Sequence, residues 1–319
     1  MTDPRGRRRP VPLGERAFHE WVRTHLPAGR RGRLPLGDDA AALPVGRSRG
    51  VLLSSDALIE NVHFRRSTPP SLIGEAATAV NLSDIAAKGG RPAAVLIDLL
   101  APPGTPAAWA RSVLLGAERM AARCGCHVVG GDTKPSPTRT VVGISVGWVS
   151  REPIPARTGA QPGDTVVTTG TVGFGGAHRS DITGALRIVP RIREGRVLGP
   201  VVHAMIDTSD GVADAAHLVA AASHCKIVLV AENLPLHPRI RRRARPFAQQ
   251  LRTAFYGGDY ELFATVAPAR LPRLRTALRS LCCPLTAIGR VEPGRGAWLE
   301  TAGRTRPLPF AGWRHFASH

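Results

Sequence analysis

Aromatic residues are scarce in this chain, at 5% of its 319 residues, so few rings are available to stack on nucleic-acid bases. The five cysteines include no C-x-x-C pair, which argues against a zinc knuckle or a dithiol redox pair and favours reduced core thiols. No apolar run approaches the ~20 residues that span a bilayer, and no apolar stretch follows the basic N-terminus. We therefore expect a cytoplasmic protein with no membrane partner.

Acidic residues are also few, since 24 Asp and Glu face 43 Lys and Arg and leave a net charge of +19. The densest basic runs are Arg5-Gly6-Arg7-Arg8-Arg9 and Arg239-Ile240-Arg241-Arg242-Arg243-Ala244-Arg245. Such runs can bind a nucleic-acid backbone by counterion release, or they can form a solvated surface in an Arg-rich protein. The low aromatic content favours the second interpretation and makes nucleic acid an unlikely partner.

The length of the chain predicts two domains, because it exceeds what one hydrophobic core usually serves. Residues 1–12 are rich in Arg and Pro and are predicted to form a disordered basic tail. A stretch rich in Pro, Gly and charge over 151–163 divides a first domain, 13–150, from a second, 151–319. Alternating patterns predict an α+β fold of two α/β domains, with helices over 14–25, 71–88, 106–123, 211–222 and 271–281, and strands over 93–100, 141–149, 164–169, 227–230 and 262–266.

Aspartates gather in short clusters that follow apolar runs and that we expect at strand ends. The clusters are Gly37-Asp38-Asp39, Ser54-Ser55-Asp56, Asn81-Leu82-Ser83-Asp84, Gly130-Gly131-Asp132-Thr133, Asp207-Thr208-Ser209-Asp210-Gly211 and Gly257-Gly258-Asp259-Tyr260-Glu261. Carboxylates brought close together repel each other unless a cation neutralises them. Hard oxygen ligands without a His or Cys set favour Mg²⁺ over zinc, which indicates phosphate chemistry. Any single cluster could equally be a turn or a helix N-cap.

Taken in order, these clusters resemble the motifs of the thiamine-monophosphate kinase family, within the superfamily of aminoimidazole ribonucleotide synthetase. The matching blocks are Leu36-Gly37-Asp38-Asp39-Ala40-Ala41, Ser54-Ser55-Asp56-Ala57-Leu58 with His63-Phe64, Asn81-Leu82-Ser83-Asp84, Gly130-Gly131-Asp132-Thr133 and Ile206-Asp207-Thr208-Ser209-Asp210-Gly211. The resemblance implies two synthetase-like domains whose N-terminal members pair across a homodimer. It also implies ATP bound with Mg²⁺, and γ-phosphoryl transfer to thiamine monophosphate that yields thiamine diphosphate and ADP.

The resemblance further implies a role for each matching residue. Metal contacts fall on Asp39, Ser54, Ser55, Asp56, Asp84, Asp132, Asp207 and Asp210. Nucleotide contacts fall on Gly131, Asp132, Arg157 and Ser209, and substrate contacts on His63 and Phe310. No residue is assigned as a general base, because the acceptor is a phosphate oxygen that is largely ionised near neutral pH. Catalysis would then consist of positioning and electrostatics.

Three departures from the family concern the acceptor, one of them Phe310, which stands where the family usually has Trp. The family's Gly-Gly-Glu-Asp-Tyr-Glu-Leu block is Gly257-Gly258-Asp259-Tyr260-Glu261-Leu262 here, so a Glu that touches the thiamine moiety is missing, with Asp259 or Glu261 as candidates to replace it. The segment 176–190 is shorter than in relatives. Two alternatives therefore stay open: a divergent paralogue that phosphorylates a different small phosphorylated acceptor, and a nucleic-acid-binding protein on an inactive kinase fold.

Overall fold

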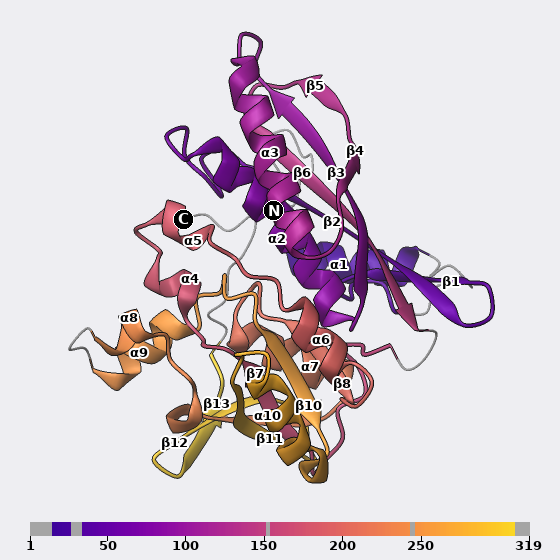
Figure 1. The fold of residues 1–319 in the computed structure, drawn as a ribbon. Coiled ribbons are helices and arrows are strands. Elements are labelled where there is room, and N and C mark those ends of the chain that lie inside the picture. The colour runs from indigo at the N-terminus through magenta and orange to yellow at the C-terminus, as the bar shows by residue number, and fades with distance from the viewer. Residues whose placement is uncertain (1–14, 27–33, 151–153, 243–245, 310–319) are drawn as a thin grey trace, which may run out of the picture.

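The computed structural model describes residues 15–26, 34–150, 154–242 and 246–309 (Figure 1). The basic tail predicted over 1–12 and the candidate substrate residue Phe310 lie outside these ranges. None of the described helices has both the length and the apolar character needed to cross a membrane. The five cysteines form no disulfide, and Cys126, Cys225 and Cys283 are buried as expected, whereas Cys282 is exposed.

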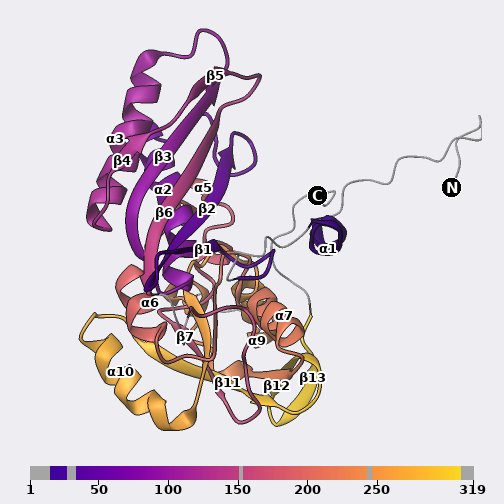
Figure 2. The same ribbon diagram turned by 90° about the vertical axis from the view of Figure 1, so that its right-hand side faces the viewer.

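The first half of the described chain forms one mixed sheet whose strand order is β1-β2-β6-β3-β4, with β5 paired to β3. A short helix, α1 (Glu15–His25), precedes it. Its elements are β1 (Ala41–Val45), β2 (Arg49–Ile59), α2 (Pro70–Ala87), β3 (Arg91–Ala101), α3 (Ala107–Arg123), β4 (Val128–Gly130), β5 (Thr133–Pro135) and β6 (Thr140–Ser150). Helices α2 and α3 cover one face of this sheet, and Figures 1 and 2 show the other face without a helix.

The second half forms a sheet in the order β13-β12-β9-β11-β7-β10-β8. Its strands are β7 (Thr165–Thr169), β8 (Ala204–Asp207), β9 (Lys226–Val230), β10 (Leu262–Val266), β11 (Leu285–Glu292), β12 (Gly296–Thr301) and β13 (Arg304–Pro307). Its helices are α4 (Phe174–Ala177), α5 (Ile182–Ala185), α6 (Ile192–Leu198), α7 (Val212–Ala222), α8 (Pro238–Arg241), α9 (Phe247–Ala254) and α10 (Leu271–Arg279). The predicted α+β fold is confirmed, while the boundary at residue 151 stays a prediction.

Helix α2 lies at the centre of the molecule and contacts both halves. Its sequence is rich in Ala and apolar residues and begins with Pro70, which favours a helix start. Most of its residues are buried, and it packs against α3, β2 and β6 on one side and against α6 and β8 on the other. One hydrophobic core therefore runs from Leu52 in the first sheet to Met205 and Leu262 in the second.

One predicted strand end is wrong, because strand β2 continues through its acidic cluster. Strand β2 extends past Ser54, Ser55 and Asp56 to Ile59, since all eleven of its residues pair with β6. Asp84 lies within α2, in agreement with the helix predicted over 71–88, and the nearby Asn81 Nδ2 donates to Ala77 O at 2.8 Å. These carboxylates are thus held by a strand and a helix, not by loops.

Helices α2 and α3 approach each other through glycine. A Cβ atom added to Gly116 would lie 1.9 Å from Ser71 O, and one added to Gly74 would lie 1.9 Å from Val113 O. Backbone atoms cannot yield like the end of a flexible side chain, so the helices would have to separate. Glycine at these positions therefore sets the distance between the two helices.

We expect Gly116→Ala to lower the free energy of unfolding by about 1–3 kcal/mol through overpacking. The loss should occur although Ala is favoured over Gly in a helix by about 0.5–1 kcal/mol. Urea denaturation measures it. Gly130→Ala is the control, because its added Cβ would lie 3.8 Å from Leu96 Cδ2, an ordinary contact. Equal stability of both variants would contradict the close-packing account.

Candidate active site

Residues Ser54 and Asp56 on β2 share the sheet face that carries α2, since side chains alternate along a strand. The Ser54 hydroxyl donates a hydrogen bond to Asp84 Oδ2 on α2. Burial raises the pKa of Asp84 well above its ordinary value, and Asp207, Asp39 and Asp56 raise it further, while the Ser54 hydrogen bond opposes them. Ser55 is exposed on the opposite face.

Asp207, the last residue of β8, belongs to the second half and lies against helix α2 next to Asp84. Its Oδ2 accepts a hydrogen bond of 2.7 Å from Ser83 Oγ on α2, and its Oδ1 accepts one of 2.8 Å from Ser209 Oγ. Burial, together with the charge of Asp39, raises the pKa of Asp207 to about 6, although the serine hydrogen bonds lower it. Ser83 and Asp207 therefore join the two halves within the acidic site.

Two loops of the second half are joined by backbone hydrogen bonds. Gly258 N donates to Ser209 O at 2.6 Å, and Thr208 N donates to Glu261 O at 2.9 Å. Both loops need glycine at their contact: Gly211 and Gly257 have φ of +101° and +100°, and Gly211 packs on the backbone of Gly257, which in turn packs on that of Asp210. This pairing brings residues 208–211 beside residues 257–261.

Tyr260 lies in this junction, with a φ of +52° that is unusual for a residue other than glycine. Burial raises the pKa of its hydroxyl well above the ordinary value, and four carboxylates add to the effect: Asp56, Asp207, Asp210 and Asp84. The carboxylates that act on this phenol thus come from two strands, a helix and a loop. The sequence predicted the four aspartates as site residues but not the tyrosine.

Asp38 and Asp39 form a separate group with two cations. Lys88 Nζ forms ion pairs with both, at 2.5 Å from Asp38 Oδ1 and 2.9 Å from Asp39 Oδ2. Arg157 Nη2 lies 2.6 Å from Asp39 Oδ1, and its Nη1 donates to Gly37 O at 2.5 Å. Burial alone would raise the pKa of Asp39, but Lys88 and Arg157 outweigh it and lower the pKa.

Asp132 lies between β4 and β5 and is exposed. Thr133 N donates to its Oδ1 at 2.7 Å and Lys134 Nζ lies 3.3 Å from its Oδ2; both contacts lower the pKa of Asp132. It is not among the carboxylates that shift the pKa of Asp84 or Tyr260. Gly131 has its own structural reason to be glycine, because an added Cβ would lie 1.9 Å from Ile97 O.

His63 follows the end of β2 in a turn, where its Nδ1 accepts a hydrogen bond of 3.0 Å from Ile59 N. In the neutral ring this places the proton on Nε2. The contact fixes the ring at the edge of the first sheet, four residues beyond Ile59, where the strand that carries Asp56 ends. Its assignment to substrate binding stays a prediction.

Asp259 and Glu261, the two candidates to replace the missing Glu, hold the fold together instead. Asp259 accepts hydrogen bonds from Gly173 N at 2.9 Å and Gly175 N at 3.3 Å, at the Gly-rich turn before α4. Glu261 pairs with Arg191 through contacts of 2.5 and 2.6 Å and accepts 2.7 Å from Thr169 Oγ1. Both carboxylates are buried and occupied within the protein, so the expected compensation is not supported.

The donor set around Asp84 and Asp207 suits a hard divalent cation such as Mg²⁺. Burial and the negative charge of neighbouring carboxylates raise the pKa of both side chains. A bound cation would relieve this repulsion. Among the described residues, however, no three His, Cys, Asp or Glu side chains converge as a ready metal cage. The carboxylate oxygens already have partners within the protein: Lys88 and Arg157 pair with Asp39, and Ser83 donates to Asp207.

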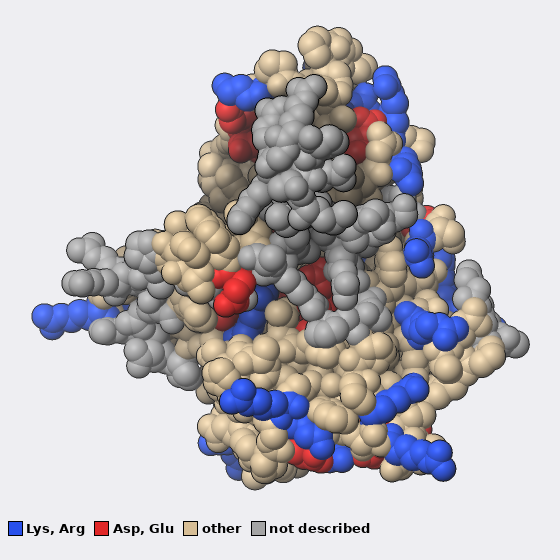
Figure 3. Space-filling model, turned by 180° about the vertical axis from the view of Figure 1, so that it is seen from behind, with Lys and Arg blue, Asp and Glu red and all other residues tan. Residues whose placement is uncertain are grey.

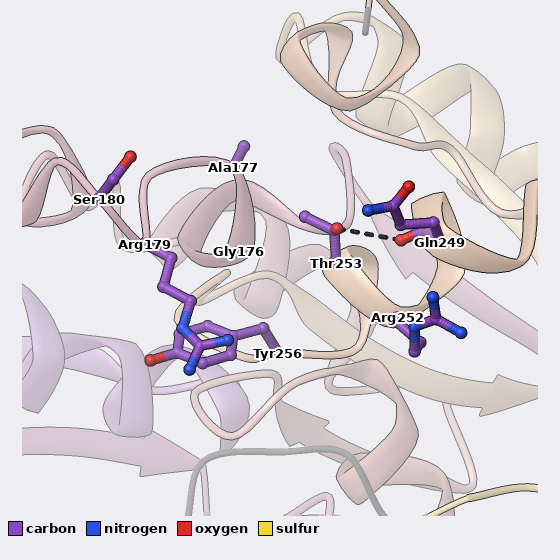
Figure 4. A pocket seen from close by; sticks show the side chains of 8 residues that line it. All are labelled: Gly176, Ala177, Arg179, Ser180, Gln249, Arg252, Thr253 and Tyr256. Atoms are coloured by element: carbon purple, nitrogen blue, oxygen red, sulfur yellow. Dashed lines mark hydrogen bonds between the residues drawn. The ribbon is translucent and has the colours of Figure 1, made fainter. Parts of the chain in front are cut away.

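A pocket of about 580 Å³ lies between α4 and α9 (Figure 4). Its described lining is Gly176, Ala177, Arg179, Ser180, Gln249, Arg252, Thr253 and Tyr256, which includes none of the predicted site residues. The Arg179 guanidinium lies 4.9 Å from the Tyr256 ring centroid, and Figure 4 shows the two stacked at the rim. The helix α5 (Ile182–Ala185) occupies the segment that is expected to be shortened.

Lys88 and Ser83 were missed as site residues by the sequence interpretation. A lysine near the end of a helix ordinarily caps the last turn on the surface, whereas the side chain of Lys88 is 0% exposed. Ser83 precedes Asp84 inside a matched motif, yet its partner Asp207 lies 124 positions away. Nothing in the local pattern marks either contact.

The chain matches two family models, described as the N-terminal and C-terminal domains of AIR synthase related proteins, over residues 37–149 and 161–299. The fold and the site thus define a two-domain protein of the AIR synthase related class. Within that class, the chain belongs to the thiamine-monophosphate kinase family, as the following relatives show. It is 31% identical to a thiamine-monophosphate kinase of Synechococcus elongatus, covering 96% of this chain and 98% of the relative.

A thiamine-monophosphate kinase of Aquifex aeolicus is 34% identical, covering 88% of this chain and 92% of the relative. Among solved structures, AaThiL complexed with AMPPCP and TMP superposes with a TM-score of 0.81 at 29% identity, covering 95% of this chain and 97% of that one. The similarity therefore extends over both halves.

The ion pair between Arg191 and Glu261 gives a test of the structural role of Glu261. We expect Arg191→Met to lower the free energy of unfolding by about 3–5 kcal/mol, because a buried carboxylate loses its partner. Arg290→Met is the matched control: Arg290 pairs with Glu300 at 2.9 Å on the exposed surface, and its loss should cost at most about 1 kcal/mol. Denaturant titration compares the two, and similar losses would argue against a buried structural pair.

Proposed function

We propose that this protein transfers the γ-phosphoryl group of ATP to thiamine monophosphate, giving thiamine diphosphate and ADP. The carrying observation is that helix α2 holds the acidic residues of both halves together: Asp84 accepts from Ser54 of β2, and Asp207 of β8 accepts from Ser83, the neighbour of Asp84. Asp56 and Asp210 act with them on the pKa of Tyr260. Family membership and the relative complexed with AMPPCP and TMP support the choice of substrates. We further propose that the reaction takes place in the cytoplasm.

Mg²⁺ would be held by the carboxylates of Asp56, Asp84, Asp207 and Asp210 together with the Ser54 hydroxyl. When bound, it supplies positive charge that offsets the repulsion between two anionic substrates. The chain's own contribution is positional: β2, α2 and β8 fix Ser54, Asp56, Asp84 and Asp207 before any substrate arrives. Asp132 and Ser55 remain predictions as metal contacts, and Gly131 as a nucleotide contact.

Arg157 and Ser209 are proposed to hold phosphate oxygens of the nucleotide. Arg157 has a planar fork suited to phosphate, but its Nε and Nη2 donate to Asp39 and its Nη1 to Gly37 O. It would thus reach a phosphate by releasing one of these acceptors. The acceptor oxygen of thiamine monophosphate is itself ionised, so no side chain has to remove a proton.

Purified protein with ATP, Mg²⁺ and thiamine monophosphate should release ADP and form thiamine diphosphate. Asp56→Asn and Asp210→Asn should each lower kcat/KM by about 100-fold or more, because a charge aimed at the phosphoryl group is lost. Asp181→Asn is the control, since Asp181 is exposed and its ion pair with Arg239, at 3.9 Å, is weak. Coupled ADP release and chromatography of the thiamine products measure both quantities.

Because the family's Glu is missing, other small phosphorylated acceptors should be assayed beside thiamine monophosphate. ADP release with another small phosphorylated acceptor, but without thiamine diphosphate formation, would replace the proposed acceptor and favour the divergent paralogue. Binding to duplex DNA with a steep salt dependence and no ATP turnover would favour the nucleic-acid alternative. On the face in Figure 3, described basic side chains are spread among acidic ones and form no continuous strip for a phosphate backbone.

A homodimer is proposed from the face of the first sheet that α2 and α3 leave open. Side chains on this face are apolar and partly exposed along three long strands: Val51, Leu53, Ala57 and Ile59 on β2, Val142, Ile144, Val146 and Trp148 on β6, and Ala94, Leu96 and Leu100 on β3. The pairing of Leu53 with Val146 and of Val146 with Ala94 puts them in one layer. Contiguous apolar patches of this kind mark protein interfaces.

We expect the wild-type protein to sediment as a dimer and Ile144→Glu to sediment as a monomer, because the new charge would be buried at the centre of the apolar layer. Leu115→Glu is the control: Leu115 is 63% exposed on α3, which covers the opposite side of the sheet. Analytical ultracentrifugation distinguishes the two states. A monomeric wild type at micromolar concentration would remove the dimer proposal.

A further inference from the structure

Lys88 is a fully buried lysine whose ammonium group lies among three oxygen atoms where the two halves meet. Its Nζ atom is 2.5 Å from Asp38 Oδ1, 2.9 Å from Asp39 Oδ2, and donates a hydrogen bond of 3.1 Å to Met205 O. The side chains of Lys88 and Asp38 are 0% exposed and that of Asp39 is 1% exposed. Carboxylate and carbonyl oxygens around one positive charge are the surroundings that a hard cation has in proteins.

Arg157 is the second cation of this group and contacts the other carboxylate oxygen of Asp39. Its Nη2 lies 2.6 Å from Asp39 Oδ1, and its backbone N donates to Asp38 Oδ2 at 3.1 Å. Asp38 and Asp39 bring two negative charges, and Lys88 and Arg157 bring two positive ones, so the group is neutral as built. Buried charges are tolerated when they are paired in this way.

Asp84 and Asp207 are held differently, although they lie beside this group. Ser54 donates to Asp84, and Ser83 and Ser209 donate to Asp207. A hydroxyl satisfies a carboxylate oxygen but brings no charge. One side of the acidic site is therefore balanced by the chain's own cations, and the other side is held by neutral hydrogen-bond donors.

We propose that the Lys88 ammonium group is a built-in cation of the acidic site, which neutralises Asp38 and Asp39 in place of a divalent ion and confines Mg²⁺ to the side of Asp84 and Asp207. The inference rests on the proposed metal-dependent function. Lys88 is a positioning residue: it acts on Asp39 directly, and through the Met205 carbonyl it holds strand β8, which ends at Asp207.

The test counts Mn²⁺ ions bound to the purified full-length chain, from the paramagnetic resonance signal of the free ion during a titration. Lys88→Met should bind one more Mn²⁺ per chain than the wild type, because Asp38 and Asp39 lose their ammonium partner. Saturating Mn²⁺ should also raise the melting temperature of Lys88→Met more than that of the wild type. Lys226→Met is the matched control, since Lys226 pairs with Glu292 at 2.8 Å in the second sheet, and it should bind the wild-type number.

A charge-balanced variant separates metal binding from general damage. Lys88→Met combined with Asp38→Asn removes one charge of each sign and should return the count to that of the wild type. If Lys88→Met does not fold even with Mn²⁺, anomalous scattering from Mn²⁺-soaked wild-type crystals decides the matter. Peaks are expected beside Asp84 and Asp207, and none at ligand distance from Asp38 or Asp39.

Equal Mn²⁺ counts for the wild type and Lys88→Met, or an anomalous peak on Asp39, would overturn the proposal. If no variant binds Mn²⁺, the metal assignment of the proposed function falls and this inference falls with it. The count does not depend on which acceptor is phosphorylated, so a failure to form thiamine diphosphate and a failure of the Lys88 proposal give different results.

Discussion

Compensation of buried negative charge is the constraint on which this structure depends. Carboxylates that stand close together inside a protein need cations or hydrogen-bond donors, because water is excluded. Here Lys88 and Arg157 balance Asp38 and Asp39, while serine hydroxyls satisfy Asp84 and Asp207. The same contacts tie α2 to β8, so the electrostatics of the site and the joining of the two sheets are one arrangement.

The location of the acidic side chains within regular elements follows from this constraint. Asp56 stands in the middle of a strand that is fully paired with β6, and Asp84 in a helix buried on nearly all sides. Side chains on such elements lose little conformational freedom when a ligand binds, because packing has already fixed them. The glycines that bring α2 close to α3 contribute indirectly, since they fix the position of the helix that carries Asp84.

The sequence predicted the fold class, the main helices and the aspartates around Tyr260, because apolar periodicity and multi-residue motifs are local signals. It ended the strand before Asp56 too early, at Ser54, since a cluster of polar residues after an apolar run looks like the end of an element when its distant partners are unknown. It did not find Lys88, whose role comes from Asp38, Asp39 and Met205, far away along the chain. It also named Asp259 and Glu261 as candidates to replace the missing Glu, because their partners Gly173 and Arg191 lie in other segments.

The left-handed backbone at Gly258, with φ of +77°, has an evolutionary consequence. The loop around it is tied at both ends, by Gly258 N to Ser209 O and by Thr208 N to Glu261 O, and an added Cβ at Gly258 would lie 3.3 Å from Gly175 Cα. A glutamate at position 258 would have to adopt a left-handed backbone and press on Gly175, which costs free energy that glycine avoids. Return of the family's carboxylate by a substitution at this position would therefore strain the loop that lies beside Ser209.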